Sequence, residues 1–156
     1  MTYSIKIEGL EELKDKLGSH KLIMGPLKTF LNKAGHTVEG RVKNYTPVDT
    51  GRLRASITTQ VEPLRATVGT NVKYSSFVEF GTRPHFPPLS AMQPWARRHG
   101  FPTGKAGAFL VALAIARHGT RPRYMFKYAL EDFDVKNKID QYLQEMYGEI
   151  KKFWES

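Results

Sequence analysis

The sequence predicts an α+β protein, in which an antiparallel sheet of three to four strands packs against a long N-terminal helix and is followed by C-terminal helices. Two patterns predict this class. Apolar and polar residues alternate over short stretches, as in strands with one buried face. Elsewhere apolar residues recur at every third or fourth position, as in amphipathic helices. The chain has 156 residues, 40% of them apolar, which is enough for one domain with a real core.

The N-terminal segment is predicted as a strand followed by a short helix. Residues 3–7 alternate between apolar and polar side chains and predict a strand. Leucines at helical spacing over residues 10–17 predict a helix, which Gly18 is suited to end.

A long amphipathic helix is predicted over residues 26–45. Pro26 suits the first turn of a helix, where its missing N–H is not needed. Gly35 and Gly40 weaken a helix and indicate close packing against a neighbour. The apolar stripe consists of Leu27, Phe30, Leu31, Ala34, Val38, Val42 and Tyr45.

A turn and two strands are predicted next. Residues 46–51 (TPVDTG) end the long helix, and the side chains of Asp49 and Thr50 are expected to satisfy nearby backbone amides of the turn. Alternation over residues 53–61 predicts a strand, and residues 66–68 continue as the returning strand.

The second half is predicted to be mainly helical. Residues 74–80 predict a short helical turn that leads into a strand. Two Pro- and Gly-rich loops, at 81–88 and 100–104, are then expected to flank a short helix. Further helices are expected over the last third of the chain, at 105–118, 125–133 and 135–153. We therefore expect an α+β domain over 1–134, with a loop-rich helical insertion at 81–122, and a C-terminal amphipathic helix at 135–156.

One short sequence occurs twice. Residues 80–85 (FGTRPH) are similar to residues 118–123 (HGTRPR), which share the tetrapeptide GTRP. Two copies do not make a repeat protein. They predict two similar loops that present arginine from one face.

The positive charge is concentrated in the centre of the chain. The net charge is +9, and residues 41–123 contain 13 Lys or Arg against three acids, whereas the two ends together contain 11 against 12. A basic centre predicts a surface that meets nucleic acid or an acidic protein face. The alternative is a scattered, solvated surface, because the basic residues form no continuous run.

The sequence predicts no catalytic, cofactor or metal site. It has no cysteine, no paired histidines at ligand spacing, and a GFPTGK segment too short for a phosphate loop. It also has no secretory signal and no apolar run long enough to span a membrane. Glu79 lies between two apolar residues, so it is either a general base of raised pKa or, as we favour, a carboxylate paired with Arg52 or Arg54.

Several motifs in one order resemble a known family. Residues 46–54 (TPVDTGRLR), 68–70 (VGT) and 78–84 (VEFGTRP), with Ser56, Ile57 and Tyr74 at their places between them, are similar to the gene-product-ten-like tail-component family of lambda-like siphophages and prophages. The resemblance extends over roughly residues 8–132. The family's motif residues correspond here to Pro47, Asp49, Thr50, Gly51, Leu53, Tyr74, Glu79, Gly81 and Thr82.

The resemblance implies a virion structural protein, not an enzyme, at the phage head–tail junction. It would act as a neck, tail-completion or tail-terminator subunit, assembled as a ring with copies of itself and with neighbouring neck and tail proteins, beside the DNA channel and away from any membrane. The rivals are a basic nucleic-acid-binding protein and a small nuclease. The residues predicted to form the interface are Arg83, His85, Phe86, Trp95, Arg121 and Arg123.

Overall fold

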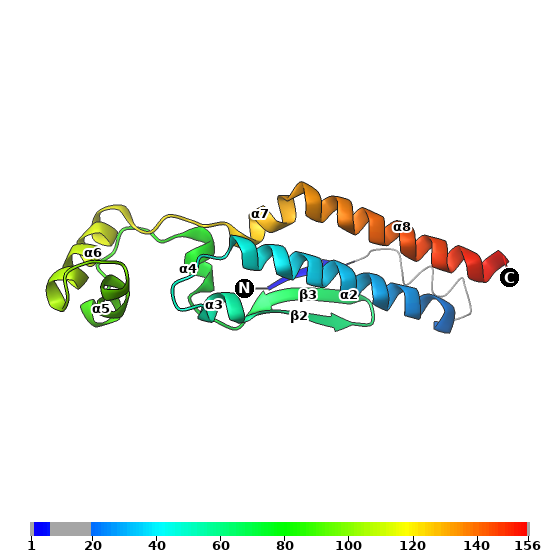
Figure 1. Ribbon diagram of the computed structural model, residues 1–156, viewed down its shortest axis with the longest axis horizontal. Coiled ribbons are helices and arrows are strands. Elements are labelled where there is room, and N and C mark those ends of the chain that lie inside the picture. The colour runs from blue at the N-terminus through cyan, green and yellow to red at the C-terminus, as the bar shows by residue number, and fades with distance from the viewer. Residues whose placement is uncertain (1, 7–19, 156) are drawn as a thin grey trace.

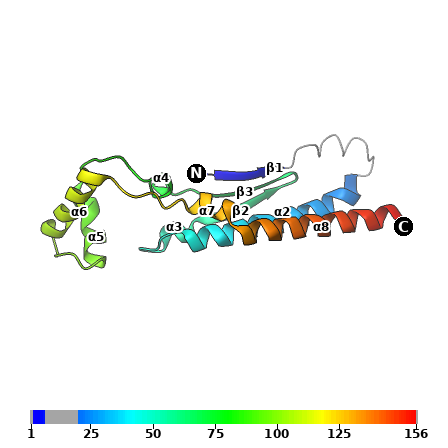
Figure 2. The ribbon, with the colours of Figure 1, turned by 90° about the horizontal axis from the view of Figure 1, so that it is seen from above.

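A computed structural model of the chain describes residues 2–6 and 20–155. The molecule is elongated, with a sheet and two long helices side by side and a pair of helices projecting at one end (Figure 1). Seen from above, the sheet lies on one side of the long helices (Figure 2). The α+β class and the long N-terminal helix are confirmed, whereas the helix predicted over residues 10–17 lies outside the described residues.

The long helix α2 spans His20–Tyr45. It begins six residues before Pro26, which lies inside it instead of in its first turn. The reason is visible in the packing: Ile23 and Leu27 are both buried, one turn apart, so the apolar face continues on the N-terminal side of the proline. This face packs on strands β2 and β3 and along helix α8.

The first part of the strand predicted over 53–61 is helical. Helix α3 spans Arg52–Ala55, and β2 begins only at Ile57 and runs to Glu62. Leu53 and Ile57 are buried, while Ala55 is exposed. The prediction from alternation was wrong here, because the buried residues are spaced by four positions, as one helical turn requires.

The sheet has the order β1–β3–β2 and is antiparallel. β3 (Arg65–Thr70) lies in the centre, with β2 as its hairpin partner and β1 (Thr2–Lys6) on its other edge. A Cβ added at Gly35 of α2 would lie 2.6 Å from the Thr59 methyl group of β2, so the close approach predicted at Gly35 is confirmed. Gly40 has nothing within 4 Å, and there the prediction was wrong.

The remaining described elements are helices. They are α4 (Ser75–Phe80), α5 (Leu89–Arg98), α6 (Lys105–His118), α7 (Met125–Glu131) and α8 (Phe133–Glu155). No strand of the described chain follows α4. Instead, an isolated bridge joins Thr82 to Thr120, so the strand predicted after the helical turn was wrong.

Residues 81–123, which carry α5 and α6, are called the arm, and the rest of the described chain is called the body. Two clusters of buried apolar residues lie along α2, one near α7 and one near the middle of α8. Neither cluster contains a residue of the arm. The arm is joined to the body by two extended segments that leave α4 and return to α7 (Figures 1 and 2).

Candidate functional site: the junction of body and arm

The two GTRP segments pair with each other at the base of the arm. The Thr82 amide donates to the Thr120 carbonyl at 3.2 Å, and the Thr120 amide donates to the Thr82 carbonyl at 3.3 Å. The two threonine hydroxyls are 3.1 Å apart. This pair of segments is called the clasp. It fixes the separation of the two ends of the arm where they leave the body.

The glycine of each copy makes the clasp possible. Gly81 and Gly119 have nearly the same backbone angles, with φ of 70° and 68° and ψ of −173° and −160°. A Cβ on Gly81 would lie 2.3 Å from the Thr120 carbonyl oxygen, and one on Gly119 would lie 2.0 Å from that of Thr82. Only glycine combines this conformation with so close an approach.

A second link joins the body to α5. Both carboxylate oxygens of Asp49 accept hydrogen bonds from Arg98, at 2.7 Å from Nε and 2.5 Å from Nη2. These bonds to Arg98 hold the pKa of Asp49 below its usual value of 3.8 and raise the pKa of Arg98. The sequence predicted that Asp49 serves its own turn. The structure corrects this, because both of its oxygens face the arm.

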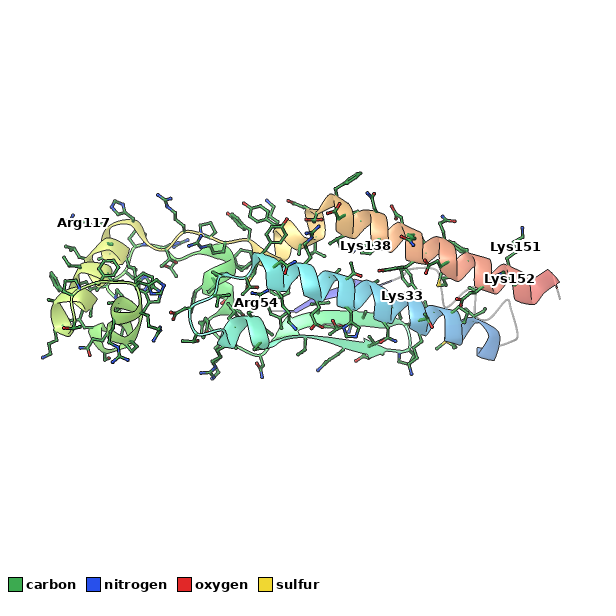
Figure 3. The ribbon with its side chains drawn as sticks, viewed as in Figure 1. Lys33, Arg54, Arg117, Lys138, Lys151 and Lys152 are labelled. Carbon is green, nitrogen blue, oxygen red and sulfur yellow. The ribbon has the colours of Figure 1, made fainter. Side chains whose placement is uncertain are left out.

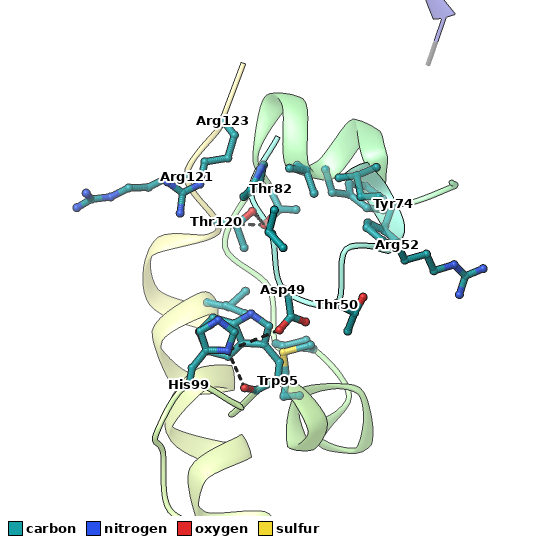
Figure 4. A pocket seen from close by; sticks show the side chains of 18 of the residues that line it. Asp49, Thr50, Arg52, Tyr74, Thr82, Trp95, His99, Thr120, Arg121 and Arg123 are labelled. Carbon is teal, nitrogen blue, oxygen red and sulfur yellow. Dashed lines mark hydrogen bonds and ion pairs between the residues drawn. The ribbon is translucent and has the colours of Figure 1, made fainter. Parts of the chain in front are cut away.

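Aromatic rings gather at the C-terminal end of α5, next to this link. The ring of His99 stacks on Trp95 with centroids 4.0 Å apart, and Phe101 lies 5.9 Å from Trp95. His99 Nδ1 lies 2.9 Å from the Trp95 carbonyl oxygen and 3.9 Å from Asp49. The stacked pair therefore stands beside Asp49 (Figure 4).

A cleft of about 1070 Å³ lies between the body and the arm. Its walls come from the turn at 47–53, from α4, from both segments of the clasp and from α5. In Figure 4, Asp49, Thr50, Trp95 and His99 gather at one side, whereas the guanidinium group of Arg121 extends away from the cavity. The cleft therefore has aromatic and hydroxyl-bearing walls and arginines at its rim.

The cleft brings together most of the residues singled out from the sequence. Seven of the nine motif residues line it, namely Pro47, Asp49, Thr50, Gly51, Leu53, Tyr74 and Thr82. Five of the six predicted interface residues do so as well, namely Arg83, His85, Trp95, Arg121 and Arg123. Phe86 lies elsewhere on the arm and packs on Phe109, with ring centroids 6.1 Å apart. Gly81 belongs to the clasp.

Glu79 lies behind the cleft and is fully buried. Its carboxylate accepts the backbone N–H groups of Phe126 at 3.0 Å and Lys127 at 3.2 Å. These are among the first N–H groups of α7, which have no partner within their own helix. The prediction of an arginine partner was wrong. Glu79 instead receives its hydrogen bonds from the positive end of a helix dipole.

The arm carries most of the net charge. Residues 81–123 contain seven Lys or Arg and no acid. Within the described part of the chain, Arg98 is the one arm cation with a salt bridge. Arg117 extends from the arm, far from the lysines of α8 (Figure 3). Apart from Arg98, the arm therefore presents cations that have no salt bridge to the described part of the body.

The contacts of Arg98 and His99 with Asp49, and the pairing of Thr120 with Thr82, were not predicted from the sequence. Arg98 and His99 end a predicted helix, where basic residues are common, so their position gave no sign of a contact with Asp49. Thr120 was visible as the second GTRP copy, but similarity between two segments does not say that they pair.

The described residues offer recognition surfaces and no recognised metal or membrane element. Among them, no group of three His, Asp or Glu side chains could hold a metal ion. Likewise, no helix of the described residues is long and apolar enough to cross a membrane. What the junction provides is aromatic surface, threonine hydroxyls and rim arginines, a combination suited to binding an apolar group flanked by negative charge.

Comparison with known proteins gives one match. Residues 10–81 match the family described as "Bacteriophage HK97-gp10, putative tail-component". This confirms the resemblance to a phage tail-component family over that range. The range includes the whole TPVDTGRLR motif and the first four residues of the VEFGTRP motif. The match ends at Gly81, the first residue of the arm. No curated protein and no solved structure matches the chain.

Proposed function

From the match of residues 10–81 to a phage tail-component family, we propose that this chain is a structural protein of a phage virion at the head–tail junction. It acts as a neck, tail-completion or tail-terminator subunit, and it works by assembling into a ring with copies of itself. The proposal assigns it no chemical step, because the cleft's one acid, Asp49, is committed to Arg98.

The observation that carries the proposal is the cationic arm on a tail-component body. A ring requires one surface of a subunit to meet a different surface of the next. The arm projects from the part of the chain that matches the family, and it has seven cations and no acid. It thus supplies a surface that differs in shape and charge from the rest of the molecule. Its partners would be acidic faces of other copies or of neighbouring tail proteins.

The first test is deletion of the gene from a phage that carries it. We expect lysates that contain heads and tails but few joined particles, as counted by negative-stain electron microscopy. Complementation with the intact chain restores joining. Normal infectious particles in the absence of the chain would contradict a role at the junction.

The second test reverses charge at the rim of the cleft. Arg83→Glu with Arg121→Glu should reduce complementation by at least tenfold, and the defect should lessen as salt screens the repulsion. The matched control is Lys28→Glu with Arg65→Glu, two exposed cations of the body outside the cleft. If both double variants complement equally well, the arm cations make no specific contribution to assembly, and this part of the proposal is wrong.

Nucleic-acid binding is the second candidate, favoured by the same seven cations beside exposed aromatic residues. Tyr74 and Phe77 at the cleft are 42% and 59% exposed, and bases stack on such rings. A titration of labelled DNA at several salt concentrations distinguishes the two. Submicromolar binding with a steep salt slope supports DNA as the partner, whereas weak binding supports a protein partner.

A further inference from the structure

We propose that the cleft receives the α7–α8 corner of a second copy of this chain, with Phe133 as the inserted side chain. The corner comprises residues 131–134 (EDFD), where α7 ends and α8 begins. This inference rests on the proposed ring and names the two surfaces that meet in it.

The side chain of Phe133 is mostly exposed to solvent, as expected of an aromatic residue that is buried in an interface. At 74%, it is the most exposed large apolar side chain of the described residues. Aromatic side chains that are exposed and later buried contribute strongly to interfaces. The side chains of its neighbours Glu131 and Asp134 are 59% and 70% exposed. The corner is therefore an aromatic side chain flanked by carboxylates.

The corner is held in place by its own contacts. Asp132 accepts the backbone N–H groups of Asp134 at 3.0 Å and Val135 at 3.3 Å, as the N-cap of α8. Arg41 and Tyr45 of α2 in turn donate to the Asp132 carboxylate, each at 2.8 Å. Phe133 thus stands on a fixed turn, so little conformational freedom is lost when it binds.

The cleft complements the corner in shape and charge. Its lining includes Trp95 and Tyr74 together with Arg83, Arg121 and Arg123. A volume of about 1070 Å³ is ample for a ring and its flanking residues, since ligand sites typically span about 300–1,000 Å³. Three salt bridges within the same copy, Arg41 with Asp132 and Asp134 and Lys127 with Glu131, involve two cations against the three acids of the corner, so the corner stays net acidic.

The two surfaces belong to different copies. None of residues 131–134 lines the cleft of its own chain, and the corner lies on the body above α2 (Figure 1). Because a cleft on one copy meets a corner on the next, the contact is heterologous, and a pair of copies still has one free cleft and one free corner. Such a contact repeats from copy to copy and gives a ring when the rotation between copies closes.

The test uses cysteine crosslinking, for which the chain is suited because it has no cysteine of its own. Met92 lines the cleft, and Asp134 is the exposed neighbour of Phe133 at the corner. Under oxidation, a chain with both Met92→Cys and Asp134→Cys keeps the Phe133 ring and should give a ladder of dimers, trimers and larger products in assembled particles and at high protein concentration. Chains with either cysteine alone should stop at dimers and give at least tenfold less crosslinked product.

Charge exchange provides an independent readout. A cleft variant, Arg121→Glu with Arg123→Glu, and a corner variant, Glu131→Lys with Asp134→Lys, should each fail to associate alone in sedimentation velocity. Their mixture should associate, because each reversed surface meets an oppositely charged one. Circular dichroism and thermal unfolding establish that both variants are folded.

The outcomes separate this inference from the proposed function. Particles that contain the chain but give no ladder, with no rescue in the mixture, would overturn the corner contact while leaving the virion role intact. Absence of the chain from particles would overturn both. Loss of DNA binding in the cleft variant, with no effect of the corner variant on any assay, would identify nucleic acid as the occupant and also overturn the inference.

Discussion

At the level of single residues, Glu79 shows how one side chain can join two helices. It lies on α4, it is fully buried, and both of its oxygens accept N–H groups from the start of α7. The body thereby holds together the two points from which the arm leaves and to which it returns. A residue whose sequence context fits a catalytic base instead accepts hydrogen bonds from the first N–H groups of a helix.

We expect Glu79→Ala to lower the free energy of unfolding by about 3 kcal/mol, because a buried and a part-buried N–H group lose a charged acceptor. Glu79→Gln keeps one acceptor oxygen and should cost about half as much. Urea denaturation followed by circular dichroism measures both. The control is Glu62→Ala, at an exposed position at the end of β2, where a change within about 0.5 kcal/mol is expected. A similarly small effect at Glu79 would disprove this role.

The pair Asp49–Arg98 should make the attachment of the arm sensitive to acid. The hydrogen bonds from Arg98 lower the pKa of Asp49 in the folded protein. Since the folded pKa lies below the unfolded one, the contribution of the pair is fully present above the usual value of 3.8 and is lost as pH falls through the lower folded pKa. At neutral pH the link is intact.

An NMR titration of the Asp49 carboxyl carbon checks this expectation. Its midpoint should lie below 3.8 in the native chain and return toward that value in Arg98→Met, which removes the donors. The same variant should increase fast backbone motion in α5, measured by heteronuclear relaxation, without a comparable change in α8. An unchanged midpoint would mean that the pair does not form in solution.

At the scale of elements, the close approach of α2 to β2 at Thr59 depends on Gly35. The Thr59 methyl group that approaches Gly35 cannot easily turn away, because the hydroxyl of the same side chain donates to Glu39 at 2.6 Å. A bulkier residue at position 35 therefore has to push the helix from the strand. The second glycine of this helix, Gly40, is open to solvent.

Alanine substitutions at these two glycines should change the free energy of unfolding in opposite directions. Gly40→Ala should stabilise the protein by about 1 kcal/mol through helix propensity. Gly35→Ala should destabilise it by about 1 kcal/mol, because overpacking outweighs the same gain in propensity. Chemical denaturation of the two variants side by side measures the difference. If both substitutions stabilise the protein, α2 and β2 are not tightly packed at Gly35 and Thr59.

The clasp should be weakened by a side chain at either of its two glycines. Gly81→Ala or Gly119→Ala places a methyl group against a carbonyl oxygen, at a backbone conformation that costs alanine about 1–3 kcal/mol. The amides of Thr82 and Thr120 should then exchange hydrogen at least tenfold faster. The control is Gly148→Ala in α8, where nothing lies within 4 Å of the added group. Unaltered exchange in the clasp variants would contradict its role.

Much of the fold follows from local patterns, and the exceptions have physical causes. The long stripe over α2 and the helices of the second half follow from apolar spacing alone. Alternation failed at Leu53, because a spacing of four residues satisfied the core equally well. The links that build the site join positions far apart, such as Asp49 with Arg98 and Glu79 with Phe126. No local pattern specifies such pairs, since they depend on where the arm folds back.

At the scale of the whole molecule, charge and shape are unevenly distributed. The arm at one end has seven cations and no acid, whereas residues 124–156 contain five Lys against seven acids. An elongated molecule with a basic end and a mildly acidic long helix favours association in which unlike regions of separate copies meet. The domain boundaries predicted at 134 and 135 remain a prediction, as does the separate role of the C-terminal helix.

The duplicated tetrapeptide allows most of the arm to be removed while one complete GTRP copy remains in the chain. Excising residues 81–118 joins Phe80 to Gly119, and the chain still reads FGTRP across the junction. The ends are near enough for a short loop, because the Tyr124 amide donates to the Glu79 carbonyl at 3.0 Å. The shortened chain should unfold cooperatively with a midpoint close to that of the full chain. It would thus be a minimal version of this protein, and one that lacks the projection through which we expect neighbours to be recognised.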